Sequence, residues 1–276
     1  MYPVAIMQGR LSDDPEGRFQ FFPSDWAAEF PIAKKLGFVG IEWLCDWPEM
    51  EAGENPLLDF WGRTAISHAV RSSGIPVVSV CADWYMKYDL RYKEQATSDW
   101  LLTIFDAATL TADRRVLVPL LEKNAPLGDA ELAAVRESLS PVLPALDKLR
   151  VSLAFESELD AEELSGFVDS FGSPWVGVVY DIGNCTSYGF DCASDIRALG
   201  SRVKGVHIKD RRRGFPQSVP LGEGDADFRR CLEALAVVGW HGHLVMQAWR
   251  GRHYLEDAKR QLAFLDSLQK EVFGGT

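Results

Sequence analysis

The sequence predicts an α/β fold, a closed (β/α)8 barrel of the TIM type that forms one domain over residues 1–276. Eight short apolar runs rich in Val and Ile alternate strictly with eight segments of helical period. This alternation is typical of parallel strands joined by helical crossovers, and eight units in about 250 residues fit a closed barrel. No GxGxxG follows the first apolar run and no GxxxxGKS/T occurs in the chain, which disfavours an open doubly wound sheet.

The predicted strands and helices follow one another along the chain. The strands are expected at residues 2–9, 37–44, 75–82, 114–121, 150–157, 175–182, 202–209 and 242–249. The helices are expected at residues 24–37, 57–74, 98–111, 129–150, 160–172, 191–201, 225–239 and 254–269. Glycines close five of these helices, where a positive φ is expected: Gly37, Gly74, Gly172, Gly200 and Gly239. Residues 45–57 are expected to form a long loop at the functional end of the barrel.

Charge and cysteine content limit what the protein binds and where it works. The chain has 29 basic and 40 acidic residues, a net charge of −11, and a pI near 5.0. Nucleic acid and anionic membranes are bound by a basic face, so neither is expected as a partner. Five cysteines without a CxxC spacing predict reduced thiols and a cytoplasmic protein. No apolar run approaches the roughly 20 residues of a membrane span, and no signal peptide is apparent.

Alternation within the strands predicts which side chains face the barrel interior. In the run VSLAFE the bulky Val, Leu and Phe share one face, so Glu156 points inward at the C-terminal end of its strand. The same register places further polar side chains on the interior near the same rim: Glu42, Asp181, His207, Lys209 and Gln247. Active sites of such barrels lie at this end of the strands.

A cluster of this composition predicts a metal site. Buried carboxylates, an imidazole and an amide are costly unless a cation or hydrogen bonds satisfy them. Hard oxygen donors with one imidazole suit Mn²⁺ or Mg²⁺, with Co²⁺ or Zn²⁺ as alternatives, and no thiolate is placed to select a softer ion. One divalent ion is therefore expected at the rim.

Several motifs carry a resemblance to a known family. The stretches VVYDIGN (178–184), GVHIKD (205–210) and VPLGEGDADF (219–228) follow one another in this order. With IMQGRL (6–11) and GFVGIEW (37–43), they resemble the sugar phosphate isomerase/epimerase family of xylose-isomerase-like TIM barrels, in particular the branch with L-ribulose/L-xylulose 5-phosphate 3-epimerase. The resemblance covers nearly the whole chain, and residues 176–250 are its most specific part.

The resemblance implies a metal held by one residue from each of the last four strands. Those residues are here Glu156, Asp181, His207 and Gln247. In the family's epimerases the fifth and eighth strands both supply glutamates, which also move protons. Gln247 departs from that pattern and puts the two-carboxylate mechanism in question.

The chemistry expected of such a site is proton transfer next to a carbonyl. A divalent metal stabilises the enediolate that forms when a carbon-bound proton is removed. Glu156 is the expected base, because the amide of Gln247 cannot accept a proton at neutral pH. A single base favours aldose–ketose isomerisation. Lys209 lies two residues after His207 on the same face and can supply a second acid, which leaves epimerisation open.

Further residues are expected to contact the substrate: Arg10, Glu42, Trp84, Asn184, Asp210, Glu223 and Trp249. The guanidinium of Arg10 suits a phosphate or carboxylate, although an ion pair with Glu42 is an equal alternative. The tryptophans offer flat apolar faces to a sugar ring, and Asp210 is expected to orient its neighbours. Both a free sugar and a sugar phosphate remain open as substrate.

Three other functions remain in view. A cyclic keto-polyol (inosose-type) dehydratase uses the same enolate chemistry, and a catalytically silent sugar-binding barrel fits the loss of a carboxylate at Gln247. A metal-dependent AP endonuclease has a similar barrel but needs many histidines, whereas this chain has five and a negative charge that repels DNA. A homo-oligomer is left open.

Overall fold

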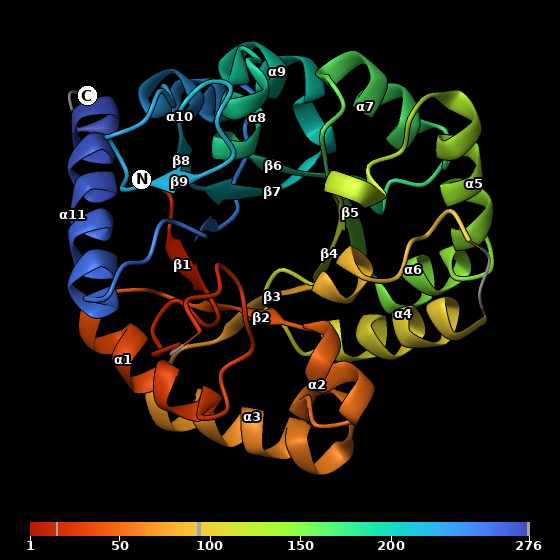
Figure 1. The fold of residues 1–276 in the computed structure, drawn as a ribbon, viewed down its shortest axis with the longest axis horizontal. Helices are drawn as coiled ribbons and strands as arrows, with labels where there is room; N and C mark the ends of the chain where they lie inside the picture. The colour runs from red at the N-terminus through yellow and green to blue at the C-terminus, as the bar shows by residue number, and fades with distance from the viewer. Residues whose placement is uncertain (15, 93–94, 275–276) are drawn as a thin grey trace.

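The computed structural model describes residues 1–14, 16–92 and 95–274 and contains a closed barrel of parallel strands (Figure 1). The strands are β1 (Val4–Met7), β2 (Ile41–Leu44), β3 (Val77–Cys81), β4 (Arg115–Leu120), β5 (Ser152–Ser157), β6 (Val176–Asp181), β7 (Val203–Ile208) and β10 (Leu244–Met246). Each strand pairs in parallel with its neighbours in chain order, and β10 pairs with β1 to close the ring. The predicted barrel and its strand order are therefore confirmed.

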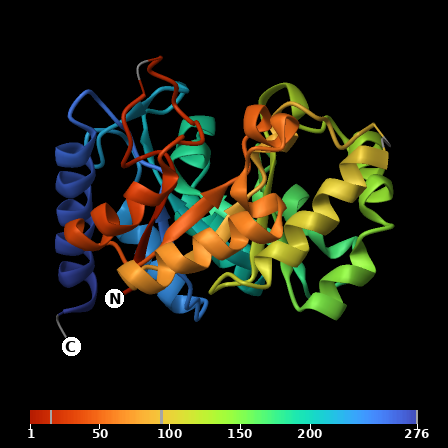
Figure 2. The same ribbon diagram turned by 90° about the horizontal axis from the view of Figure 1, so that it is seen from below.

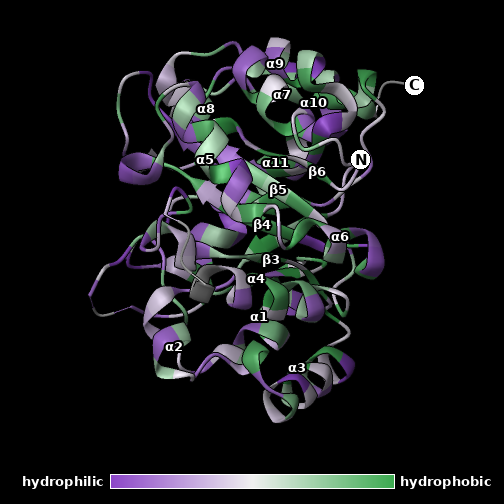
Figure 3. Ribbon diagram, turned by 90° about the vertical axis from the view of Figure 1, so that its right-hand side faces the viewer, coloured by the Kyte–Doolittle hydropathy of each residue, from purple (hydrophilic) through white to green (hydrophobic). Residues whose placement is uncertain are grey.

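Helices surround the barrel, and hydrophobic residues concentrate on the strands inside them (Figures 1 and 3). They are α1 (Glu29–Leu36), α2 (Trp47–Ala52), α3 (Phe60–Ser73), α4 (Gln95–Ala108), α5 (Asp129–Leu139), α6 (Leu143–Leu149), α7 (Ala161–Asp169), α8 (Ile182–Tyr188), α9 (Cys192–Leu199), α10 (Phe228–Val237) and α11 (Tyr254–Phe273). None of those that the structure describes is both long and apolar enough to cross a bilayer.

The strand register agrees with the predicted alternation. Phe155 of β5 packs against Phe167 and Phe171 at the helix layer, with ring centroids 5.1 and 5.6 Å apart. Glu156 therefore lies on the opposite side of the strand, toward the barrel interior. On the neighbouring strands β6 and β7, Asp181 and His207 are register partners. These pairings bring the predicted polar side chains to one end of the barrel.

The structure differs from the predicted elements in three places. Residues 129–150 form two helices, α5 and α6, because Pro141 and Pro144 lack the N–H that a continuous helix needs. The loop expected at 45–57 contains α2, whose first turn is capped by the Asp46 carboxylate through the Trp47 amide. A further helix, α8, begins directly after β6, where Asp181 caps it. The five glycines that close predicted helices all have positive φ.

The loop after β1 extends over one end of the barrel. It stands at the same end as α2 and the hairpin of β8 (Asp210–Arg211) and β9 (Ser218–Val219), away from both termini (Figure 2). The buried carboxylate of Glu29, at the start of α1, accepts hydrogen bonds from the amides of Gly9 and Leu11 and from the hydroxyl of Ser12. Glu29 therefore fixes the beginning of this loop.

Glu29 provides a test of how this loop is held. Burial raises the pKa of Glu29 to about 7, and the hydrogen bonds from Gly9, Ser12 and Leu11 oppose that rise only in part. Because the folded state binds this proton more tightly than the unfolded chain does, the contribution of Glu29 to the free energy of unfolding falls as the pH rises from about 4.5 to about 7. Glu29→Gln should flatten the pH dependence of unfolding in that window. Urea titrations at several pH values measure it.

The control for this prediction is Asp25→Asn, which changes an exposed acid next to the same helix. This variant should show the same pH dependence of the free energy of unfolding as the wild-type protein. An unchanged slope in Glu29→Gln would contradict the assignment of this titration to Glu29.

Candidate metal centre

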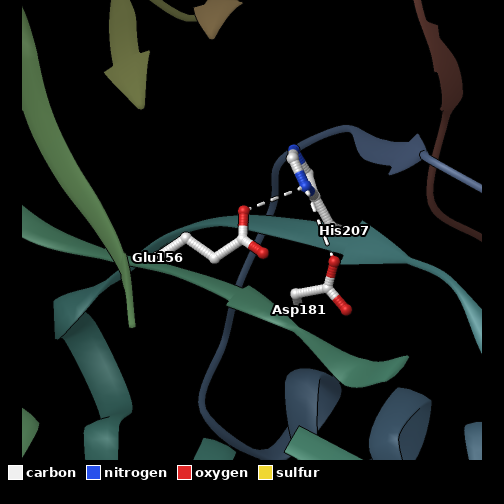
Figure 4. Close-up of side chains that lie close together, drawn as sticks. All are labelled: Glu156, Asp181 and His207. Atoms are coloured by element: carbon white, nitrogen blue, oxygen red, sulfur yellow. Dashed lines mark ion pairs between the residues drawn. The ribbon is translucent and has the colours of Figure 1, made fainter. Parts of the chain in front are cut away.

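Three side chains from consecutive strands meet inside the C-terminal end of the barrel (Figure 4). Glu156 is the penultimate residue of β5, Asp181 ends β6 and His207 lies in β7, and each offers one possible ligand atom within 4.8 Å of the others. His207 Nδ1 is 3.6 Å from Glu156 Oε2 and 3.8 Å from Asp181 Oδ2. All three residues are buried. This triad (Glu156, Asp181 and His207) can hold a metal ion.

The opposite nitrogen of His207 is already engaged. Nε2 lies 2.7 Å from Glu42 Oε1, whereas Nδ1 has no hydrogen-bond partner among the described residues. Burial alone would lower the pKa of His207, but the carboxylates of Glu42, Glu156 and Asp181 outweigh it and raise this pKa. With Nε2–H donating to Glu42, Nδ1 is the nitrogen that faces the two other carboxylates, and in the neutral ring its lone pair can bind a metal.

Lys209 lies beside the triad. Its Nζ is 2.9 Å from Asp181 Oδ2 and donates to Gln247 Oε1 at 2.8 Å. Burial opposes the ionised form of Asp181, but Lys209 and His207 outweigh it and lower the pKa of this carboxyl. The structure thus brings Lys209 and Gln247 to the triad, with the Gln247 oxygen turned to the ammonium.

Glu156 has a different environment from Asp181. Burial and the neighbouring Asp181 raise its pKa to about 7, and His207 and Lys209 only partly oppose this. Asn184 Nδ2 donates to Glu156 Oε1 at 2.5 Å. The backbone N–H of Asn184 donates to Asp181 Oδ1 at 2.8 Å. Asn184 therefore orients two members of the triad at once. A carboxyl with a pKa close to neutrality is suited to both accepting and returning a proton.

The donor set fits a divalent cation. Two carboxylate oxygens and one imidazole nitrogen converge from three strands, and the buried Nδ1 of His207 lacks any other partner in the described chain. Such a mixture of hard oxygen donors and one nitrogen suits Mn²⁺, Mg²⁺, Co²⁺ or Zn²⁺. The five cysteines are all buried and free, and none belongs to this cluster.

Gln20, in the loop after β1, contacts residues at the strand ends near the triad and was not predicted from the sequence. Gln20 accepts from Gln247 Nε2 and donates to Asp83 Oδ1, both at 2.7 Å, so its side chain links the eighth and third strand ends. Burial and the nearby Asp46 and Glu156 raise the pKa of Asp83 to about 7. The sequence of this loop has no periodic pattern, so its path and these contacts could not be predicted from it.

A cleft of about 700 Å³ opens beside this loop, and arginines line it: Arg10, Arg18, Arg211, Arg250 and Arg252. Arg10 is buried, and its Nη1 donates to the Phe19 carbonyl while Nε and Nη2 have no partner among the described residues. Burial and the neighbouring Arg250 lower the pKa of Arg10 to about 9. Phe19 lies between this cleft and the triad, with its ring 4.1 Å from Arg10 Cζ and 5.5 Å from Lys209 Nζ.

The other predicted substrate contacts are more dispersed. Trp249 lines the arginine cleft, whereas Trp84 is buried and stacks on Tyr88 at 4.2 Å. Both oxygens of Asp210 accept backbone amides of residues 222–226, so Asp210 holds that loop. Glu223 is exposed in the same loop. Glu42, predicted to contact substrate, lies fully buried behind His207.

Comparisons with known proteins agree with the barrel fold. The family model for the xylose isomerase-like TIM barrel matches residues 30–268. L-ribulose-5-phosphate 3-epimerase UlaE of Salmonella heidelberg is 27% identical over 242 residues, which are 81% of this chain and 82% of that protein. The named epimerases among the relatives are isomerase-class enzymes, the class that the sequence predicts.

Solved structures share the fold. That of an L-ribulose 3-epimerase has a TM-score of 0.73 at 18% identity and covers 99% of this chain and 96% of its own. That of 3-keto-D-glucoside 4-epimerase from E. coli has a TM-score of 0.73 at 16% identity, and the match covers 97% of this chain and 100% of that one. Together with the family match, this shows that the chain belongs to the xylose isomerase-like TIM barrel family.

Proposed function

We propose that the protein is a divalent-metal-dependent sugar epimerase that acts on a ketose phosphate through an enediolate. The observation that carries this proposal is the triad of Glu156, Asp181 and His207 with Lys209 beside it. A divalent cation held by the triad would stabilise the negative charge that develops on the substrate oxygens. Mn²⁺ or Mg²⁺ suits these donors best.

Two proton-carrying groups reach the site from different strands. Glu156 removes the proton from the carbon next to the carbonyl, for which its pKa of about 7 is well matched. Asn184 holds the other oxygen of this carboxyl and thereby orients it. Lys209 returns a proton from a second direction, and this allows inversion at one carbon. Gln247 accepts a hydrogen bond from Lys209 and positions it, in place of a second carboxylate.

The phosphate of the substrate is proposed to bind in the arginine cleft. Arg10 and Arg211 line it, and both have guanidinium nitrogens without partners among the described residues. Unpaired buried guanidinium groups are costly, and a phosphate satisfies them with paired hydrogen bonds. The related UlaE enzymes are named for a pentulose 5-phosphate, which has a phosphate at the end remote from the ketone.

The test of this function is proton exchange with solvent. The purified protein is incubated in D₂O with pentulose 5-phosphates, free pentuloses and hexuloses, and inososes, each with added Mn²⁺. Epimerisation predicts deuterium at C3 together with inversion there. A product aldose would show isomerisation, loss of water would show a dehydratase, and binding without exchange would show a silent sugar-binding barrel.

Two variants separate the base from the metal ligand. Glu156→Gln should abolish deuterium incorporation while it retains measurable Mn²⁺, because an amide can still lend an oxygen but cannot take a proton. His207→Ala should lose Mn²⁺ first, because it removes a neutral nitrogen ligand. His68→Ala is the matched control, since His68 is exposed on α3. Wild-type exchange rates in Glu156→Gln would show that another group is the base.

Arg10 tests the phosphate assignment. Arg10→Met should raise KM for the phosphorylated substrate by tenfold or more and leave KM for the corresponding free sugar nearly unchanged, because only the phosphate contacts the guanidinium. Arg212→Met, at an exposed position that does not line this cleft, is the control and should change KM little. An equal effect of Arg10→Met on both substrates would contradict a phosphate site at Arg10.

Removal of the Lys209 ammonium group is expected to strengthen metal binding and to slow turnover. Its ammonium lies 2.9 Å from Asp181 Oδ2 and repels a second cation there, so Lys209→Met should tighten Mn²⁺ binding by about tenfold or more. The same change removes a proton donor and should lower kcat at least a hundredfold. Titration calorimetry and steady-state kinetics measure the two effects. Lys204→Met, on the same strand, serves as control. Weaker Mn²⁺ binding in Lys209→Met would contradict the proposed competition.

A further inference from the structure

The interior of the barrel beneath His207 contains an arginine. Arg115 begins β4 and is 2% exposed, although such interiors are usually filled by branched apolar side chains. Gly205 of β7 makes room for it, since a Cβ at Gly205 would lie 2.8 Å from Arg115 Cζ. The guanidinium therefore occupies a space that the neighbouring strand leaves open.

The contacts of Arg115 connect the far end of the barrel to the triad. Nη1 donates to the Lys204 carbonyl at 2.8 Å and is 3.2 Å from Asp113 Oδ2. Nη2 donates to Ser79 Oγ at 3.0 Å and is 3.5 Å from Glu42 Oε2. Asp113 Oδ1 is in turn 2.8 Å from His243 Nδ1. The chain of polar contacts thus runs from partly exposed groups before β4 and β10 to the carboxylate behind His207.

Glu42 needs this support. Its side chain is fully buried, and a buried carboxylate without a cation is strongly destabilising. Ser79 donates to one oxygen at 2.5 Å, and the other oxygen faces His207 Nε2 at 2.7 Å. An ionised carboxylate can only accept hydrogen bonds. A proton of His207 must therefore lie on Nε2, and Nδ1 is the nitrogen that faces Glu156 and Asp181.

We propose that Arg115 is a positioning residue of the metal centre, which pairs with Glu42 and so selects the His207 tautomer that binds metal through Nδ1. This inference rests on the proposed metal-dependent function. Among the described residues, Arg115 has no hydrogen bond or ion pair with the triad. It acts on His207 through Glu42. Asp113 and the Lys204 carbonyl hold the other side of its guanidinium.

Three variants test this role. Arg115→Met should weaken Mn²⁺ binding by 10- to 100-fold, the usual effect of losing a partner of a metal-bound histidine. Arg115→Lys should recover part of that loss. Gly205→Ala keeps the charge but displaces the guanidinium and should also weaken binding. Arg114→Met, at the exposed neighbouring position, is the matched control and should bind Mn²⁺ as the wild type does.

A spectroscopic measurement separates positioning from a merely structural role. In metal-free protein with ¹⁵N-labelled histidine, at a pH where His207 is neutral, its nitrogen shifts should report the Nε2–H form in the wild type and a mixture of forms in Arg115→Met. In a Glu42→Gln background, Arg115→Met should cause little further loss of Mn²⁺ affinity, because both changes break the same link.

The outcomes distinguish this inference from the proposed function. Unchanged Mn²⁺ affinity and an unchanged His207 tautomer in folded Arg115→Met would overturn the positioning role. If wild-type protein bound no divalent ion, the proposed function would fail, while the tautomer measurement would still test the role of Arg115. Should Arg115→Met not fold, Gly205→Ala and Asp113→Asn provide the same two readouts.

Discussion

Burial of charge at the mouth of the barrel is the constraint that shapes this site. Three carboxylates, Glu42, Glu156 and Asp181, face two cations, Lys209 and Arg115, and all five groups have almost no contact with water. Each cation is paired at one end of the cluster, so an excess of negative charge remains between them, around Nδ1 of His207. Burial and the neighbouring Asp181 raise the pKa of Glu156, and the three carboxylates raise the pKa of His207 against the effect of its burial. A divalent cation at the same place would balance this charge, and this is the physical argument for the proposed metal site.

The distinction between Glu156 and Asp181 follows from the same arrangement. Asp181 lies against Lys209 and caps α8, and its lowered pKa keeps it ionised. Glu156 accepts a hydrogen bond from the Asn184 side chain, and burial with the neighbouring Asp181 raises its pKa to about 7. Two carboxyls on adjacent strands thus acquire different chemical roles from their surroundings. The neutral Gln247 belongs to this balance, because its oxygen accepts from Lys209 where a carboxylate would add more negative charge.

The parts of the site that the sequence predicts are those set by strand periodicity. Glu156, Asp181 and His207 are on the interior because residues alternate along a strand and parallel strands align their ends. Gln20 and Asp83 were not predicted, because loop conformation has no such regularity. Arg115 was not predicted, because the room for its side chain is made by Gly205 of β7, which is distant in the sequence. The break between α5 and α6 was predictable from Pro141 and Pro144, because proline cannot donate the backbone hydrogen bond of a helix interior.

The most direct test of the metal centre is a crystal of the protein soaked in Mn²⁺ and measured for anomalous scattering. The account predicts one strong peak within about 2.0 to 2.5 Å of one oxygen each of Glu156 and Asp181 and of Nδ1 of His207, distances typical of such ligands. It also predicts that binding of Mn²⁺ moves Lys209 Nζ farther from Asp181 Oδ2 than 2.9 Å. A peak bound through Nε2 of His207, a peak at another cluster, or no peak at saturating Mn²⁺ would contradict the account.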